Sequence, residues 1–122
     1  MPGFVGNIEE LTKSNTNFRK VLFTGPKCQL VVMSINPGES IGVETHPSTD
    51  QFIRIEEGEG LLIIDGQTYD LEEDMAMVIP AGAKHNIINT SNEETMKLYS
   101  VYSPPHHPDK LVQKTKADAR KK

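Results

Sequence analysis

Two histidines, a carboxylate and an amide lie in two short stretches whose spacing suits metal binding. In PGESIGVETHPSTDQFIRIEEGEG, residues 37–60, Glu44 and His46 are two positions apart. Because side chains two apart in a strand point to the same face, these two project together. A turn at Pro47 then leads to a predicted strand that opens at Gln51, whose amide oxygen can lie beside His46. This stretch predicts half of a metal site.

A second stretch, PAGAKHNIIN at residues 80–89, supplies another imidazole. Pro80 and Gly82 predict a turn, and the strand that follows begins at His85. If this strand lines the same cavity, two neutral imidazoles and one carboxylate converge, which is the facial set that suits Fe(II) and related divalent ions. The predicted metal ligands are Glu44, His46, Gln51 and His85. Nitrogen and oxygen ligands of this kind accept Fe, Mn, Ni, Zn or Co, so the identity of the ion stays open.

Further side chains are candidates for moving protons beside such an ion. Tyr99 and Tyr102 lie in the last predicted strand with opposite parity, so at most one of them faces the cavity. Either hydroxyl is a candidate catalytic acid, and Glu44 is a third candidate if the ion leaves it free. His106 and His107 stand among three prolines, which allows an imidazole at the cavity mouth, at a subunit contact or in a surface loop.

Brief apolar or alternating runs, separated by turn residues, fill most of the chain. The predicted strands cover residues 18–24, 29–35, 41–46, 51–57, 61–65, 68–71, 75–79, 85–89 and 96–103. Asp65-Gly66 is a strong hairpin signal, and Asn7 is the predicted N-cap of one short helix at residues 8–13. Many short strands without long crossover helices predict an antiparallel sandwich or barrel.

Length and charge limit what the chain can be. Its 122 residues, 36% hydrophobic and 25% charged, suit one domain with one modest core. Residues 1–109 hold sixteen acidic and seven basic side chains, whereas residues 110–122 hold six basic side chains and Asp118. An acidic body with a short basic tail argues against a nucleic-acid partner. The predicted organisation is an N-terminal segment at 1–17, a barrel at 18–105 and a C-terminal extension at 106–122 that lies on the surface or frays.

Cysteine usage and hydropathy bear on location. Cys28 is the single cysteine and cannot form an intrachain disulfide, and no apolar run approaches the length that spans a bilayer. The N-terminal residues lack the apolar region of a secretory signal. We therefore expect a cytoplasmic protein without a membrane partner.

The two stretches resemble the paired motifs of the cupins. The second cupin motif is a glycine, five residues, Pro-x-Gly, two residues, His, three residues and Asn. Its positions are filled here by Pro80, Gly82, His85 and Asn89, with Asp74 in place of the leading glycine. In the first motif, His46 falls on the second histidine and Gly58 on the closing glycine. Glu44 replaces the first histidine of that motif, and Gln51 replaces its glutamate.

The resemblance covers about residues 18–103 and implies an all-β fold. The expected architecture is a double-stranded β-helix, or jelly-roll barrel, with a short N-terminal helix and a basic C-terminal tail. A glutamine also occurs at the fourth ligand position of some metal-binding cupins, including a type that acts on unsaturated uronates. The ending SPPHHPDKLVQKTKADA is similar to small cupins described as mannose-6-phosphate-isomerase-like.

The resulting hypothesis is a metal-dependent isomerase or lyase that acts on a sugar, a sugar acid or a similar small molecule. Two alternatives stay open at this point, an Fe(II) oxygenase and a non-catalytic protein that binds a metabolite or sugar. Small cupins often pair their exposed sheet edges or pack barrel faces, so we also expect a homodimer.

Overall fold

The chain folds into two facing sheets with one helix near each end. The structure is a computed structural model and describes residues 2–120. The helices are α1 (Ile8–Ser14) and α2 (Lys116–Arg120). The strands are β1 (Arg19–Thr24), β2 (Gln29–Ile35), β3 (Glu44–Thr45), β4 (Asp50–Glu57), β5 (Gly60–Ile64), β6 (Gln67–Leu71), β7 (Ala76–Ile79), β8 (Lys84–Asn89), β9 (Met96–Ser103) and β10 (Val112–Gln113).

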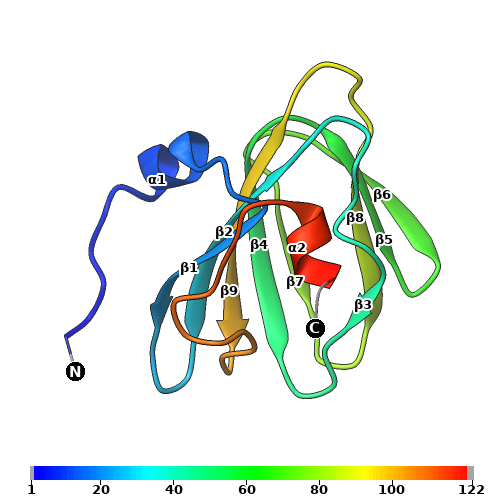
Figure 1. Cartoon of the computed structure of the whole chain (residues 1–122). Coiled ribbons are helices and arrows are strands. Elements are labelled where there is room, and N and C mark those ends of the chain that lie inside the picture. The colour runs from blue at the N-terminus through cyan, green and yellow to red at the C-terminus, as the bar shows by residue number, and fades with distance from the viewer. Residues whose placement is uncertain (1, 121–122) are drawn as a thin grey trace.

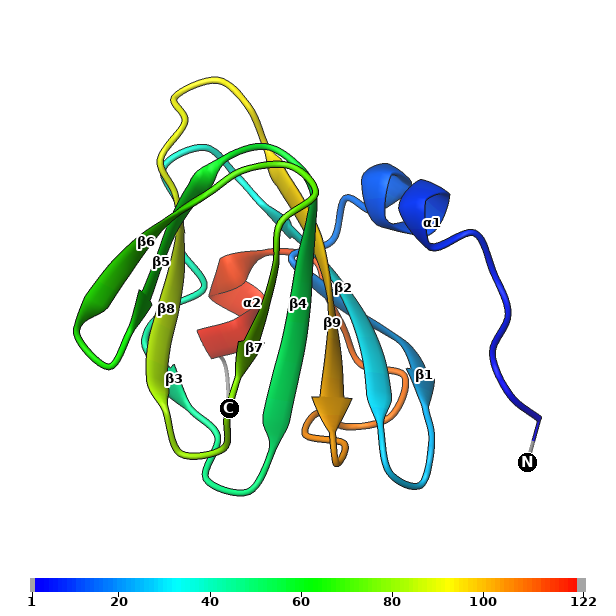
Figure 2. The same cartoon turned by 180° about the vertical axis from the view of Figure 1, so that it is seen from behind.

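The strands form a six-stranded and a four-stranded sheet. The order is β10-β1-β2-β9-β4-β7 in the first sheet and β3-β8-β5-β6 in the second, and all neighbours are antiparallel. Figure 1 and Figure 2 show the sheets facing each other, with β8 and β5 opposite β4 and β9. This is the all-β jelly-roll barrel that the sequence predicts, and the prediction is confirmed.

Apolar side chains on the inner faces of the two sheets make the core. In β8 the alternation is plain, because His85, Ile87 and Asn89 are buried whereas Lys84 is exposed. The buried apolar core consists of Phe18, Val21, Val31, Met33, Ile35, Ile53, Ile55, Leu62, Leu71, Ile79, Ala83, Ile87, Met96, Leu98 and Tyr102. Removal of these side chains from water holds the two sheets together.

Local sequence signals place most elements correctly. Eight of the predicted strands are present, with each end shifted by at most one residue. Asn7 caps α1 by accepting a hydrogen bond from the backbone N–H of Glu10 at 3.0 Å. At the β5–β6 hairpin, Asp65 and Gly66 have φ of 45° and 85°, the positive values that a tight hairpin turn requires.

The predicted strand at residues 41–46 is largely wrong. Only Glu44–Thr45 form strand β3, and Ser40 makes an isolated bridge to Ile88. Between these pairings Gly42 adopts a φ of 101°, and its N–H donates to the side chain of Asn86 at 2.9 Å. Because the N–H of Gly42 bonds to a side chain and not to a backbone carbonyl of β8, the backbone ladder with β8 is interrupted there.

The C-terminal extension does not fray over its described part. Strand β10 pairs with β1, and Leu111 and Ala119 pack against the core. Lys116 Nζ donates to Ser40 Oγ at 3.2 Å, which joins α2 to the segment before β3 (Figure 1). A two-residue strand has no hydrophobic periodicity, so sequence patterns do not reveal it. Across residues 2–120, neither helix reaches the length and apolarity of a membrane span.

Candidate metal site

Strands β3 and β8 bring the two motif stretches together. Glu44 and His85 are directly opposite each other in the register of β3 and β8, so their side chains share one face of the sheet. His46 follows β3, and its carbonyl oxygen accepts a hydrogen bond from the N–H of Gly82 at 2.9 Å. This bond joins the β3–β4 loop to the β7–β8 turn at the lower end of the barrel in Figure 1.

Ligand atoms of three predicted metal ligands converge at this end. Glu44, His46 and His85 each offer one nitrogen or oxygen atom, and these atoms lie within 4.8 Å of one another. The two histidines are 5% and 3% exposed, and their ring centroids are 5.3 Å apart. A Glu44 carboxylate oxygen lies 3.7 Å from His46 Nε2, too far for a hydrogen bond. One ligand atom of each of the three residues therefore lies within reach of a single ion.

Buried ring nitrogens in this set have no hydrogen-bond partner. His85 Nδ1 lies 3.1 Å from the carbonyl oxygen of Ala83 and donates to it, which leaves the lone pair on Nε2. Neither His85 Nε2 nor either ring nitrogen of His46 has a hydrogen-bond partner in the described part of the chain. A buried unpaired polar atom costs about 1–3 kcal/mol. A divalent ion would satisfy one ring nitrogen of each histidine, so the residues present fit a metal.

Gln51 adjoins the set through Tyr102. Its side-chain nitrogen donates to Ser100 Oγ at 3.2 Å and to the Tyr102 hydroxyl at 3.1 Å. The amide oxygen is therefore the free end of the side chain, and it is buried without a partner. The Tyr102 ring is 5.7 Å from the ring of His46. The amide oxygen is thus unpaired on a side chain that is bonded to Tyr102, and its role as a metal ligand stays a prediction.

Arg19 is a site residue that sequence reasoning missed. Its buried guanidinium lies 3.5 Å from one carboxylate oxygen of Glu44, and it donates to the Gln113 side chain of β10 at 2.9 Å. Burial raises the pKa of the Glu44 carboxyl, but the nearby His46 imidazole and Arg19 guanidinium outweigh it and leave the pKa below its usual value. Glu44 is therefore a carboxylate at neutral pH. Arg19 shares parity with the apolar residues of β1, which is the sequence signal that marks it as inward-facing.

Only one of the two candidate tyrosines belongs to this site. Tyr102 is buried among His46, Gln51 and the core, and burial raises the pKa of its hydroxyl well above the usual value. Tyr99 has the opposite parity and packs against Phe52 with ring centroids 6.2 Å apart, so the structure does not bring it to the ligand set. It lies on the outer face of the sheet.

The segment after β9 brings a further imidazole to the site. The ring of His106 lies 4.1 Å from the ring of His46, and His107 packs edge-on against Tyr102 at 4.9 Å. Burial lowers the pKa of His107 to about 3, with a smaller effect from the charge of Arg19. Both histidines therefore pack against rings of the site, His106 against His46 and His107 against Tyr102.

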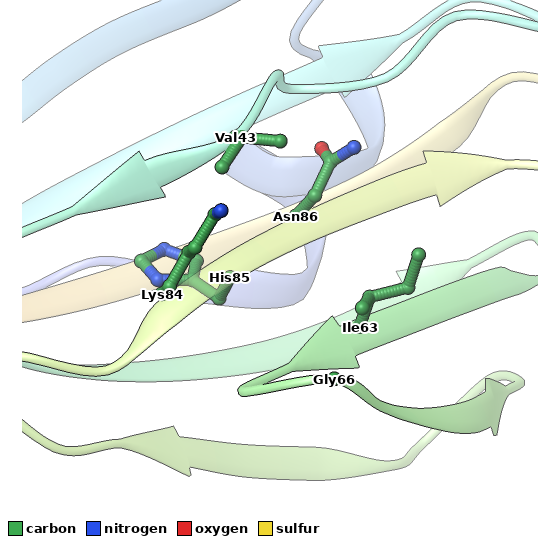
Figure 3. A pocket seen from close by; sticks show the side chains of 6 residues that line it. All are labelled: Val43, Ile63, Gly66, Lys84, His85 and Asn86. Atoms are coloured by element: carbon green, nitrogen blue, oxygen red, sulfur yellow. The ribbon is translucent and has the colours of Figure 1, made fainter.

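A separate depression lies on the outer face of the second sheet. Its volume is about 220 Å³, and it is lined by Val43, Ile63, Gly66, Lys84, His85 and Asn86. In Figure 3, the His85 ring lies on the other side of the β8 ribbon from Asn86, in agreement with the alternation of the strand. Of the three converging residues, His85 alone lines this outer depression.

Comparison with known proteins identifies the family. The cupin domain family matches residues 31–102, and the chain belongs to this family. The more specific likeness to mannose-6-phosphate-isomerase-like cupins stays a prediction.

Three relatives are similar over most of the chain. The uncharacterized protein YrkC of Bacillus subtilis is 48% identical over 123 residues, which is 95% of this chain and 65% of YrkC. The chain therefore spans a little under two thirds of that relative. The uncharacterized protein L612 of Acanthamoeba polyphaga mimivirus is 47% identical over 86% of this chain and 68% of its own length. The crystal structure of BH2720 from Bacillus halodurans superposes with a TM-score of 0.94 at 47% identity, over 97% of this chain and 93% of that chain.

More distant structures share the fold alone. The structure of KdgF from a Halomonas species has a TM-score of 0.66 at 20% identity, over 72% of this chain and 78% of that chain. The metal-ligand geometry described above therefore carries the functional argument.

Proposed function

We propose that this cupin binds a divalent metal ion through Glu44, His46, His85 and Gln51, and that it is an enzyme of isomerase or lyase type. The expected substrate is a sugar, a sugar acid or a similar small molecule. The observation that carries the proposal is the group of buried, unpaired ring nitrogens facing a carboxylate. A bound ion of this kind acts as a Lewis acid on a carbonyl or hydroxyl oxygen.

The surrounding residues have defined tasks in this proposal. Arg19 holds one oxygen of Glu44 and leaves the other directed toward His46. The backbone of Ala83 fixes the tautomer of His85. Tyr102 accepts a hydrogen bond from Gln51, and that bond leaves its own hydroxyl proton for donation to a substrate oxygen. Because its pKa is raised, Tyr102 acts as an acid and not as a base near neutral pH.

Elemental analysis of the purified protein after reconstitution tests the metal site. We expect stoichiometric metal in the wild type. The affinity should fall by about tenfold or more in His46→Ala and in His85→Ala, because each loses a ligand atom. Lys84→Ala is the matched control, since Lys84 neighbours His85 in β8 but faces outward. A wild-type protein without stoichiometric metal after reconstitution would contradict the site.

An Fe(II) oxygenase is the second candidate function. The observation that favours it is the ligand set itself, because two histidines and one carboxylate are typical of non-haem Fe(II) oxygenases. Oxygen uptake by the Fe(II)-loaded protein with candidate substrates, compared with the Mn(II)- and Ni(II)-loaded forms, separates the two functions. Turnover without oxygen consumption would eliminate the oxygenase.

We also propose that the protein is a homodimer that pairs exposed sheet edges. Support comes from the apolar side chains on the edge strands β6 and β7, of which Tyr69 and Val78 are exposed.

A further inference from the structure

A single buried glutamine fixes the segment that follows β9. Gln29 of β2 is fully buried, and its side-chain oxygen accepts hydrogen bonds from the backbone N–H groups of His106 at 3.2 Å and His107 at 2.9 Å. Its side-chain nitrogen donates to the carbonyl oxygen of His107 at 2.7 Å and to Thr24 Oγ1 at 3.0 Å. The position of His106 is therefore built into the fold (Figure 1, the segment after β9).

His106 stands between the buried ligand set and solvent. Its ring is 4.1 Å from the His46 ring and lies nearly parallel to the Tyr102 ring, with an interplanar angle of 21° and a centroid distance of 5.9 Å. Unlike His46 and His85, it is exposed. It is not one of the three residues whose ligand atoms converge. No hydrogen bond joins its ring to a described residue, so one imidazole N–H remains to be donated in either tautomer.

The charges at the site favour an anionic ligand. Glu44 is the one carboxylate of the converging set among residues 2–120, and Arg19 lies 3.5 Å from it. Because the guanidinium balances the carboxylate, the two positive charges of a divalent ion would stay uncompensated by the protein. A small carboxylate bound to the ion would supply negative charge, and its second oxygen can accept a hydrogen bond.

We propose that His106 is a substrate-contacting residue that donates a hydrogen bond to a small carboxylate ligand on the solvent side of the metal. The inference rests on the proposed metal site and narrows its ligands to anions. It also gives the segment after β9 a role that lies outside the two cupin motifs.

Acetate binding to the Co(II)-loaded protein, followed by visible absorption, tests this contact. We expect His106→Ala to weaken acetate binding by about tenfold or more, because it removes one hydrogen bond to a charged group. His106→Gln retains an N–H donor and should restore the affinity to within about threefold of the wild type. Co(II) affinity should change by less than about threefold in both variants, since His106 is not a ligand.

Acetamide and Lys84→Ala are the matched controls. Acetamide has the shape of acetate without its charge, and we expect it to bind more weakly and with little dependence on His106. Lys84→Ala removes an outward-facing side chain and should leave acetate binding unchanged.

Each contrary result would overturn a different part of the proposal. Unchanged acetate binding in His106→Ala overturns the contact, and equal binding of acetamide and acetate overturns the anionic ligand class. Loss of Co(II) binding in His106→Ala would show that His106 contributes to metal binding, and this result also overturns the proposal. Failure of the wild type to bind Co(II) overturns the proposed metal site together with this inference, whereas the other outcomes leave the metal site standing.

Discussion

The Glu44 carboxylate needs a compensating positive charge nearby, which a neutral histidine at its position would not need. A half-buried carboxylate loses part of its hydration, and Arg19 compensates from the neighbouring sheet at 3.5 Å. Arg19 is held in turn by Gln113 of β10 at 2.9 Å. The C-terminal extension thus reaches the metal-ligand set through one arginine, and Arg19 acts as a positioning residue for Glu44.

Replacement of Arg19 by methionine tests this positioning role. Arg19→Met keeps a long apolar stem but removes the charge beside Glu44, so the pKa of that carboxyl should rise and the carboxylate should lose its fixed orientation. We expect metal affinity to fall by about 10- to 100-fold, measured by calorimetric titration with Co(II) or Ni(II).

A second arginine of the same sheet provides the control. Arg54 also pairs with carboxylates, Asp74 at 3.0 Å and Glu56 at 3.2 Å, but lies outside the metal-ligand set. Arg54→Met should therefore leave metal affinity unchanged. A folded Arg19→Met protein with wild-type affinity would show that Glu44 needs no support from Arg19.

The sequence predicts the site residues that lie in the two motif stretches. It misses the site residues that only tertiary contacts bring to the site. Strand parity, turn spacing and the resemblance to the cupin motifs together predicted the set of Glu44, His46 and His85. Arg19, which contacts Glu44, is bonded to Gln113, 94 positions away. His106 depends on Gln29, 77 positions away. Contacts at such separations have no local pattern to reveal them.

Turn chemistry sets the boundaries of most elements. Asp74 stands where the second cupin motif has its leading glycine, and it has a φ of 70°, a left-handed conformation that favours glycine and that aspartate tolerates. This one position explains how the motif keeps its turn without its glycine. Strands β3 and β10 were poorly predicted because each has only two residues. The strands beside them, and not their own sequence pattern, determine their pairing.

Gly60 lies where the backbones of β5 and β8 approach each other closely. It opens β5 opposite Asn89 of β8, and a β-carbon placed there would lie 2.2 Å from the carbonyl oxygen of Ile88 and 2.4 Å from Met96 Cε. Because the carbonyl belongs to the β8 backbone, the β5–β8 ladder must shift to make room. We expect Gly60→Ala to lower the free energy of unfolding by about 2–3 kcal/mol in urea titrations.

Gly3 is the matched control for this substitution. A β-carbon at Gly3 would meet no atom within 4 Å, so Gly3→Ala should leave the free energy of unfolding unchanged. Equal stability of Gly60→Ala and the wild type would show that the barrel accommodates a methyl group at this position by a small adjustment.

At the scale of the whole molecule, the two sheets leave apolar edge strands uncovered. β7 ends the six-stranded sheet and β6 ends the four-stranded sheet, and a groove of about 250 Å³ lies along them. The groove is lined by Leu62, Ile64, Tyr69, Leu71, Met75, Ala76, Met77 and Val78. An exposed apolar edge invites pairing with another strand, and in the proposed homodimer a second copy of the chain provides it.

Two equally exposed valines make this proposal testable. Val78 in β7 and Val43 just before β3 are both 64% exposed, but Val43 lies outside the groove. Light scattering at micromolar concentration should return a dimer for the wild type and for Val43→Glu. Val78→Glu should return a monomer, because a carboxylate buried in an apolar interface without a partner is costly. A monomeric wild type would overturn the homodimer, and dissociation by Val43→Glu alone would move the interface to the β3 edge.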